Sequence, residues 1–168
     1  KADGTVWTWG NNQYGQLGNG EVENVNISEA KQVIGINGNG KLENIKQITV
    51  GSFSVAALTN DGRVVAWGRN TFGQLGRQDN IDSGIPSYVV DETGKQITDI
   101  LQISAGASHM LAVTKQGEVL AWGLNNYGQL GNGNNSNQSS PVYMVDGAGN
   151  QITDAIKVGC GNHFTVVL

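Results

Sequence analysis

One phrase, Trp-Gly-x-Asn-x-aromatic-Gly-Gln-Leu-Gly, occurs three times in the chain. The copies span residues 9–18, 67–76 and 122–131, so their tryptophans are 58 and 55 residues apart. A period of this length indicates a repeat architecture, in which each unit buries its apolar face against its neighbours. Because repeat folds usually present extended binding surfaces, the pattern favours binding over chemistry in one enclosed pocket.

The composition suits short strands joined by tight turns. Of 168 residues, 25 are glycine and only 14% are charged, which argues against long solvated helices. The net charge of −4 is mild, and the ten Lys and Arg residues are scattered singly, so nucleic acid is not expected as a ligand. No apolar stretch of the sequence approaches the ~20 residues that a membrane span requires.

The sequence contains no motif for a cofactor or a metal. Its Gly-x-Gly triplets lack the third glycine of a dinucleotide site, and there is no Gly-Lys-Ser/Thr phosphate loop and no Gly-x-Ser-x-Gly elbow. Cys160 is the only cysteine, so it can form neither an internal disulfide nor a cysteine-based zinc site, and we interpret it as a small buried hydrophobe. We therefore expect no cofactor and no bound metal.

Two short apolar runs flank a turn in each unit. In the second unit, residues 55–58 lead through Thr-Asn-Asp-Gly into residues 63–67, and Asp-Gly between apolar runs is a strong hairpin signal. Both alternating faces of these runs are apolar, which is typical of a strand covered on both sides. A further strand of each unit is predicted at residues 45–51, 100–106 and 155–161.

The repeated phrase contains three glycines after its tryptophan. A regular helix is therefore excluded, and a fixed loop is expected. We predict that its aromatic residue and its leucine (Leu17, Leu75 or Leu130) fill the space between sheets. Four short strands per unit, stacked side by side, predict an all-β fold, a β-propeller of four-stranded blades.

The domain organisation expected is a single propeller segment over residues 1–168, with repeat phrases at 3–58, 61–113 and 116–168. Three units form only a partial ring, and an open arc leaves two apolar blade faces bare. The last and the first segments of the chain match the two sides of a hairpin that occurs within it, so the end of one copy could continue into the start of another. We therefore expect either a segment of a longer propeller or two chains that pair into a six-bladed ring.

The combined pattern Asp-Gly-x-Val-x-Ala-Trp-Gly-x-Asn-x-x-Gly-Gln-Leu-Gly, followed by Ile-x-x-Ile-x-Ala-Gly-x-x-His-x-x-Ala, resembles the repeats of the regulator of chromosome condensation family. Residues 61–76 and 100–113 carry it most fully. The histidine of the pattern is His109 in the second copy but Ser54 in the first and Phe164 in the third. The resemblance implies a propeller, generally of seven blades, and a role as an interaction scaffold. The abundant Asn and Gly are similar to the bacterial members, which favours a bacterial protein that is extracellular or on the cell surface.

Candidate partner-binding residues are positions that differ among copies which otherwise agree. A framework position must repeat because it fills the same packing space, whereas a varying loop tip more often faces solvent and carries binding residues. The first set lies at the tip between a framework glycine and the strand that follows it: Phe53, Ser108 and His163, with Ser52, Ala107 and Asn162. The second set follows Trp-Gly: Asn11, Arg69 and Leu124.

The function expected is a non-enzymatic scaffold that binds another protein, of unknown identity, through its rim loops, with no catalytic residues. One alternative is guanine-nucleotide exchange factor-like binding of a small GTPase. Another is a propeller hydrolase or lyase, for which only His109 with Asp99 or Asp154 is available. We expect His109 to be structural and the two aspartates, which occupy equivalent sites, to serve turns. A third alternative is that the repeats only space other domains.

Overall fold

The computed structural model describes residues 1–168 and is nearly all β, as predicted. In chain order its elements are β1 (Trp7–Asn11), β2 (Asn26–Gln32), the single 3-10 turn η1 (Ile36–Gly38), β3 (Ile45–Val50), β4 (Ser54–Thr59), β5 (Val64–Gly68), β6 (Ser83–Tyr88), β7 (Ile100–Ala105), β8 (His109–Thr114), β9 (Val119–Gly123), β10 (Gln138–Tyr143), β11 (Val158–Cys160) and β12 (Thr165–Val167). The chain has no helix with the length and apolar character of a membrane span.

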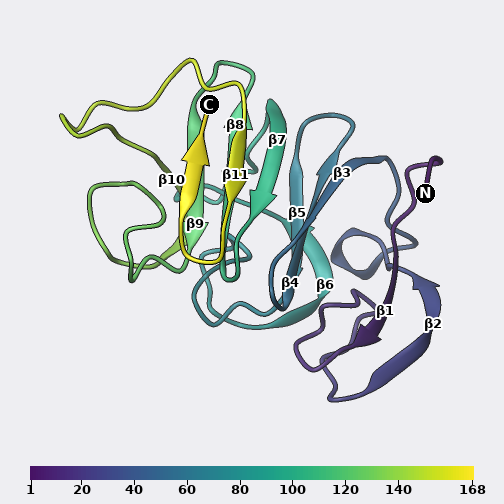
Figure 1. The fold of residues 1–168 in the computed structure, drawn as a ribbon. Helices are drawn as coiled ribbons and strands as arrows, with labels where there is room; N and C mark the ends of the chain where they lie inside the picture. The colour runs from purple at the N-terminus through teal and green to yellow at the C-terminus, as the bar shows by residue number, and fades with distance from the viewer.

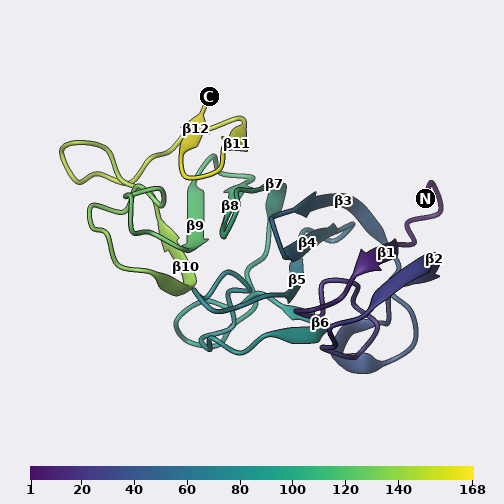
Figure 2. The same cartoon turned by 60° about the horizontal axis from the view of Figure 1, so that its bottom comes forward.

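The strands form two complete four-stranded blades and two half-blades. The complete blades are the antiparallel sheets β3-β4-β5-β6 and β7-β8-β9-β10, in which every strand pairs with the next one along the chain. The half-blades are the two-stranded sheets β1-β2 and β11-β12. Figure 1 and Figure 2 show the four sheets side by side in chain order, with the half-blades at the two ends of an arc. The molecule is a partial β-propeller.

The glycine turns predicted between the apolar runs form hairpins. Residues 59–62 join β4 to β5, and Gly62 has a φ of +84°, a conformation that only glycine adopts without strain. The next complete blade repeats this at Gly117, with a φ of +80°. The strands of these hairpins are buried along their whole length, which confirms that both of their faces are covered.

A blade is not the same stretch of chain as a repeat phrase. The blade β3-β4-β5-β6 takes its inner two strands from residues 45–59 and its outer two from residues 64–88, on either side of the Asp-Gly turn. Each hairpin turn therefore joins one repeat phrase to the next. Because of this offset, twelve strands give two complete blades and two halves.

Neighbouring blades are joined through the repeated tryptophan. Trp67 and Trp122 are both fully buried, and each indole Nε1 donates to a carbonyl in the glycine-rich loop of the preceding blade, Gln16 and Gln74 respectively, at 3.0 Å. Each interface between sheets also contains its own apolar cluster. The loop of one repeat thus completes the core of the next.

The two end faces of the arc carry exposed apolar side chains. Trp9, in the same motif position as Trp67, is 64% exposed, because no other sheet in the structure packs against this face of β1-β2. Similarly, Ile48 on β3 is 54% exposed, whereas Ile103, its equivalent on β7, is covered by the preceding blade and is only 2% exposed. The far end bears Phe164, Val166 and Leu168, all more than half exposed.

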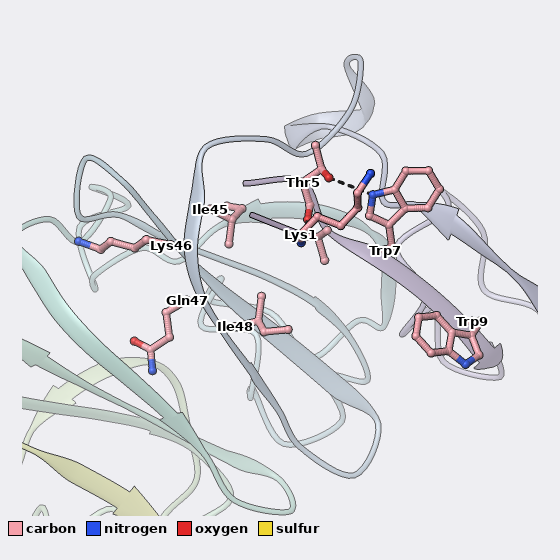
Figure 3. Close-up of a pocket in the computed structure, with 9 residues that line it drawn as sticks. Lys1, Thr5, Trp7, Trp9, Ile45, Lys46, Gln47 and Ile48 are labelled. Carbon is pink, nitrogen blue, oxygen red and sulfur yellow. Dashed lines mark hydrogen bonds between the residues drawn. The ribbon is translucent and has the colours of Figure 1, made fainter. Parts of the chain in front are cut away.

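A groove of about 340 Å³ separates β1 from β3 at the first end. Figure 3 shows Trp7 and Trp9 on one side of it and Ile45 and Ile48 on the other, with the Trp7 indole donating to the Thr5 hydroxyl at 2.9 Å. In a complete blade this region holds the two inner strands, which β1-β2 lacks.

Candidate protein-binding rim

The glycine-rich loop is held rigid by two amide side chains. In the second repeat the buried Asn70 accepts a hydrogen bond from Leu75 N at 2.8 Å and donates through Nδ2 to the Asp79 carbonyl at 2.9 Å. Gln74 Oε1 accepts from Phe72 N at 2.9 Å. Both bonds recur in the other two repeats. The leucine N–H donates to the asparagine side chain (Leu17 to Asn12, Leu130 to Asn125), and the aromatic residue's N–H donates to the glutamine side chain (Tyr14 to Gln16, Tyr127 to Gln129). These bonds satisfy the backbone of a tight loop without a strand partner.

The aromatic residue of this loop does not fill the space between sheets, so this part of our prediction is wrong. The leucines are buried as predicted: Leu17, Leu75 and Leu130. In contrast, Tyr14 and Phe72 are half-buried and Tyr127 is 71% exposed. A single buried leucine already fills the interior at each loop. The bond from the aromatic residue's N–H to the glutamine fixes the turn that carries the ring on the rim.

The predicted tips form a connected row at the rim. Ser52 N donates to the Ala107 carbonyl at 3.0 Å, and Ala107 N donates to the Asn162 carbonyl at 3.2 Å. Each of these bonds joins one blade to the next. The tips therefore have fixed spacing, because the blades that carry them are held together directly at this rim.

The two predicted sets of residues are adjacent. Arg69 N donates to the Phe53 carbonyl at 2.8 Å, and Leu124 N donates to the Ser108 carbonyl at 2.8 Å. This follows from strand pairing, since Ser54 on β4 lies opposite Gly68 on β5. The tip before the second strand and the residue after Trp-Gly thus meet at the same end of every complete blade.

Arg69 lies among three aromatic rings. Its guanidinium carbon is 4.9 Å from the centroid of Tyr14, 5.7 Å from that of Phe72 and 6.0 Å from that of Phe53. The Tyr14 and Phe53 rings meet edge to face at 4.9 Å, and Arg69 Nε donates to the Thr71 hydroxyl at 3.1 Å. We call Arg69, Tyr14, Phe53 and Phe72 the arginine–aromatic cluster.

Sequence reasoning found two members of the arginine–aromatic cluster and missed two. Phe53 and Arg69 are candidates because they differ among the repeats. Tyr14 and Phe72 occupy a position that is aromatic in every copy, so the repeat pattern predicts that they belong to the core. The signal that could have found them is the leucine three residues further on, which already supplies the buried apolar group of the same loop.

A smaller contact lies at the third tip. The rings of His163 and Tyr127 are tilted against each other with centroids 5.0 Å apart. Both residues line a depression of about 290 Å³. The tip between the arginine–aromatic cluster and this pair of rings consists of Ala107 and Ser108, which are small and half-buried. The rim therefore projects less at its centre than at these two places.

Two candidates of the second set have side chains that are buried or hydrogen-bonded within the protein. Leu124 is buried, with 6% of its surface exposed. Its side chain is apolar and packs away from solvent, whereas the other two repeats have polar residues at this position. Asn11 is exposed, but its side chain accepts from Gln16 Nε2 at 2.8 Å and donates to Asn26 Oδ1 at 3.2 Å. Of this set, Arg69 alone is charged, and its two terminal guanidinium nitrogens make no hydrogen bond.

His109 is inside the protein and is neutral at pH 7. Burial, with a smaller contribution from the charge of His163, lowers its pKa to about 4. Its Nε2 lies 3.3 Å from the Thr165 hydroxyl, which itself donates to the Gln129 carbonyl at 2.7 Å. The hydroxyl therefore accepts from His109, and the ring connects β8 to the half-blade β11-β12.

The acidic residues considered for catalysis lie away from His109. Asp99 precedes β7, whose first residue pairs with the last residue of β8, so it is at the opposite end of the blade from His109. Asp99 and Asp154 have φ values of +59° and +64°, which fits the turn role expected. Asp99 accepts from Lys115 at 2.7 Å, and this bond lowers the pKa of its carboxyl group.

Cys160 is half-buried, not fully buried as expected, because it belongs to a half-blade with one open side. Burial raises the pKa of its thiol to about 11, so the thiolate is scarce at neutral pH. The Cys160 backbone N–H donates to the Ser104 hydroxyl at 3.1 Å. This thiol is part of the packing between β7 and β11.

The blades and their rim of fixed tips define a repeat protein of the β-propeller class. Three consecutive segments, residues 3–58, 61–113 and 116–168, each match the model of the regulator of chromosome condensation (RCC1) repeat, and a second model of this repeat matches residues 45–74 and 100–129. The chain belongs to the RCC1 repeat family.

Curated relatives are much longer than this chain. The E3 ubiquitin-protein ligase HERC2 of Mus musculus is 34% identical over 167 residues, which are 99% of the chain and 3% of HERC2. The ultraviolet-B receptor UVR8 of Arabidopsis thaliana is 36% identical over 159 residues, 92% of the chain and 34% of the receptor. The chain thus spans at most about a third of these relatives.

Solved structures share the fold. Human WBSCR16 has a TM-score of 0.77 at 28% identity and is matched over 100% of this chain and 40% of its own. Prp20p of Saccharomyces cerevisiae has a TM-score of 0.80 at 23% identity, over 97% of this chain and 39% of its own. Both matches cover nearly all of this chain but only about two fifths of the neighbour.

Proposed function

We propose that this chain is a non-enzymatic interaction scaffold whose protein partner docks on the rim of loop tips. The observation that carries the proposal is the arginine–aromatic cluster. Two sets of positions that vary among otherwise similar repeats meet in it, and Tyr and Arg are among the residues that dominate the energy of protein interfaces. The hydrogen-bonded loops below hold the rings in place, so a partner pays little entropy to order them.

Solved neighbours support a binding role by analogy of fold. Prp20p was described with its binding to Gsp1p and histones, and yeast RCC1 (Prp20) in complex with Kap60. Small-GTPase binding, the alternative that the family resemblance implies, is the second candidate function. The Asn- and Gly-rich loops support our further proposal that the chain comes from a bacterial surface or secreted protein.

A capture experiment with matched variants tests the rim. The chain is immobilised and exposed to extract of the source cells, and retained proteins are quantified by mass spectrometry. In one variant Phe53→Ser replaces an exposed ring by the residue that the second repeat has at this position. In the control, Tyr143→Ser removes a comparably exposed ring on β10, at the opposite end of the blade.

We expect at least one protein to be captured by the unmodified chain and by Tyr143→Ser but not by Phe53→Ser. Retention of the same proteins by all three forms would contradict the rim as the binding surface. If the protein lost on Phe53→Ser is a small GTPase, the second candidate function is supported.

We also propose that a second copy of the chain covers the bare end faces when no further blades do so. In complete blades Ala56 pairs with Ala66 and Leu111 with Ala121. The equivalent residues of the half-blades are Val166 on β12 and Thr8 on β1. Two chains would then pair β12 of one copy with β1 of the other and form a six-bladed ring.

Light scattering and cross-linking test this pairing. We expect a folded species of twice the chain mass of 17.7 kDa. Cysteines introduced by Thr8→Cys and Val166→Cys should form an intermolecular disulfide, whereas Ser28→Cys, on the exposed outer strand β2, should not pair with Val166→Cys. A well-folded monomer at all concentrations would refute the pairing.

A further inference from the structure

Arg69 is the only arginine without an acidic partner. The chain has three arginines. Arg63 pairs with Asp61 at 3.5 Å and Arg77 with Asp79 at 3.2 Å. No carboxylate lies within ion-pair distance of Arg69, although the chain as a whole carries an excess of acidic residues.

The setting of Arg69 leaves its donors available. Only Nε makes a hydrogen bond, to the Thr71 hydroxyl, and the two terminal nitrogens make none. The guanidinium carbon lies over the rings of Tyr14, Phe53 and Phe72, which limits its motion and displaces water. Because the terminal nitrogens make no hydrogen bond, their N–H donors are available, and this planar fork matches a carboxylate in two parallel hydrogen bonds.

The tip segments around Arg69 contain no acidic residue, and the acidic residues Asp79 and Asp82 of its loop are bonded to other groups. The six tip segments have neither Asp nor Glu: residues 11–16, 51–54, 69–74, 106–109, 124–129 and 161–164. The acidic residues of the same loop further along are engaged internally. Asp82 accepts from Asn70 N at 2.7 Å, and Asp79 accepts from Ile81 N at 3.1 Å while it pairs with Arg77.

We propose that Arg69 is the anchor for an Asp or Glu side chain in an acidic segment of the partner protein. The carboxylate accepts from the terminal nitrogens of Arg69, and the apolar part of the same segment lies on Phe53, Tyr14 and Phe72. This inference rests on the proposed rim function and names the chemistry that the rim recognises. Only the second repeat offers this site, because the equivalent residues are Asn11 and Leu124.

The test uses random peptides, so that no partner needs to be known. A library of displayed 12-residue peptides is selected against the folded 168-residue chain and, in parallel, against the Arg69→Asn and Arg63→Asn variants. Arg69→Asn is chosen because the first repeat folds with Asn at this position. Arg63→Asn removes the same charge from the opposite end of the blade, where Arg63 also lies over a ring, that of Tyr88. Circular dichroism confirms that each variant is folded.

We expect Asp and Glu to be enriched among peptides selected by the unmodified chain and by Arg63→Asn, but not by Arg69→Asn. The affinity of the best peptide, measured by fluorescence anisotropy, should fall at least tenfold on Arg69→Asn. Replacement of its essential acidic residue by the matching amide should cause a similar loss, and the two losses should not add.

Failure of this inference and failure of the proposed function give different results. Peptides that lose affinity on Phe53→Ser but neither contain acidic residues nor respond to Arg69→Asn would refute the carboxylate site and leave the rim as a binding surface. Peptides that are indifferent to both substitutions would refute the rim as well.

Discussion

The burial of the repeated tryptophan depends on its neighbour, and this can be measured. Trp122 is fully buried and its indole donates to the Gln74 carbonyl, whereas Trp9 is 64% exposed and its indole makes no hydrogen bond. Truncation of a buried aromatic residue to alanine costs about 3–5 kcal/mol. We therefore expect Trp122→Ala to lower the free energy of unfolding by about 4 kcal/mol, since a buried carbonyl also loses its donor. Trp9→Ala should change it by less than about 0.5 kcal/mol.

Urea unfolding followed by far-ultraviolet circular dichroism measures both effects, because this signal comes mainly from the backbone and each variant retains the other three tryptophans. The m-value must be compared among variants, since blades of a repeat protein can unfold separately. Trp67→Ala serves as a second buried case, with the same indole–carbonyl bond at 3.0 Å.

Equal losses for Trp9→Ala and Trp122→Ala at low protein concentration would refute the reasoning, because motif position and not the neighbouring blade would then determine stability. A loss for Trp9→Ala that grows with protein concentration would instead show that a second copy covers the end face.

Three further outcomes follow from single residues. Gly76→Ala should destabilise the chain by more than about 1 kcal/mol, because Gly76 has a φ of +63° and an added methyl would lie 2.7 Å from a valine side chain; Gly147→Ala, with nothing within 4 Å, should be neutral in the same urea titration. Buried His109 has a folded pKa of about 4, below its unfolded value, so the unfolded state binds more protons between the two values. Stability should thus fall as the pH drops from about 6.5 to 4, by up to about 3 kcal/mol, and urea midpoints at the two pH values should show a smaller fall for His109→Gln. The Cys160 thiol, with a pKa of about 11, should react with a disulfide reagent at pH 8 much more slowly in the folded chain than in urea; equal rates would contradict its burial.

The sequence was sufficient to predict the strands, hairpins and blade class, because these depend on local signals that recur three times. Asp61-Gly62 specifies a turn by backbone conformation alone, and the apolar residues on both faces of 64–67 require cover on both sides. The orientation of Tyr14 could not be predicted in this way. Whether an aromatic ring lies inside or outside depends on which group already fills the interior, and hydrophobicity does not distinguish Tyr14 from Leu17.

Variation among the repeats located the candidate site but did not determine which variants are exposed. Arg69 and Leu124 occupy the same position after Trp-Gly, and both donate their backbone N–H to the neighbouring tip at 2.8 Å. The backbone there is the same, yet the Arg69 side chain is half-buried beside the rings of the rim and the Leu124 side chain is buried. Exposure at this position is therefore decided by the chemistry of the side chain, not by the fold.

This independence of backbone and side chain explains how binding chemistry can reside in one blade of a repetitive fold. The loop is held by Asn70 and Gln74, whose bonds are made to backbone groups and recur in every repeat. Arg69 takes no part in those bonds, and the chain itself contains folded examples with Asn11 and Leu124 in its place. A substitution at Arg69 can thus remove a charge from the rim while the loop that carries it remains intact. A loss of binding in such a variant would then be attributable to the guanidinium.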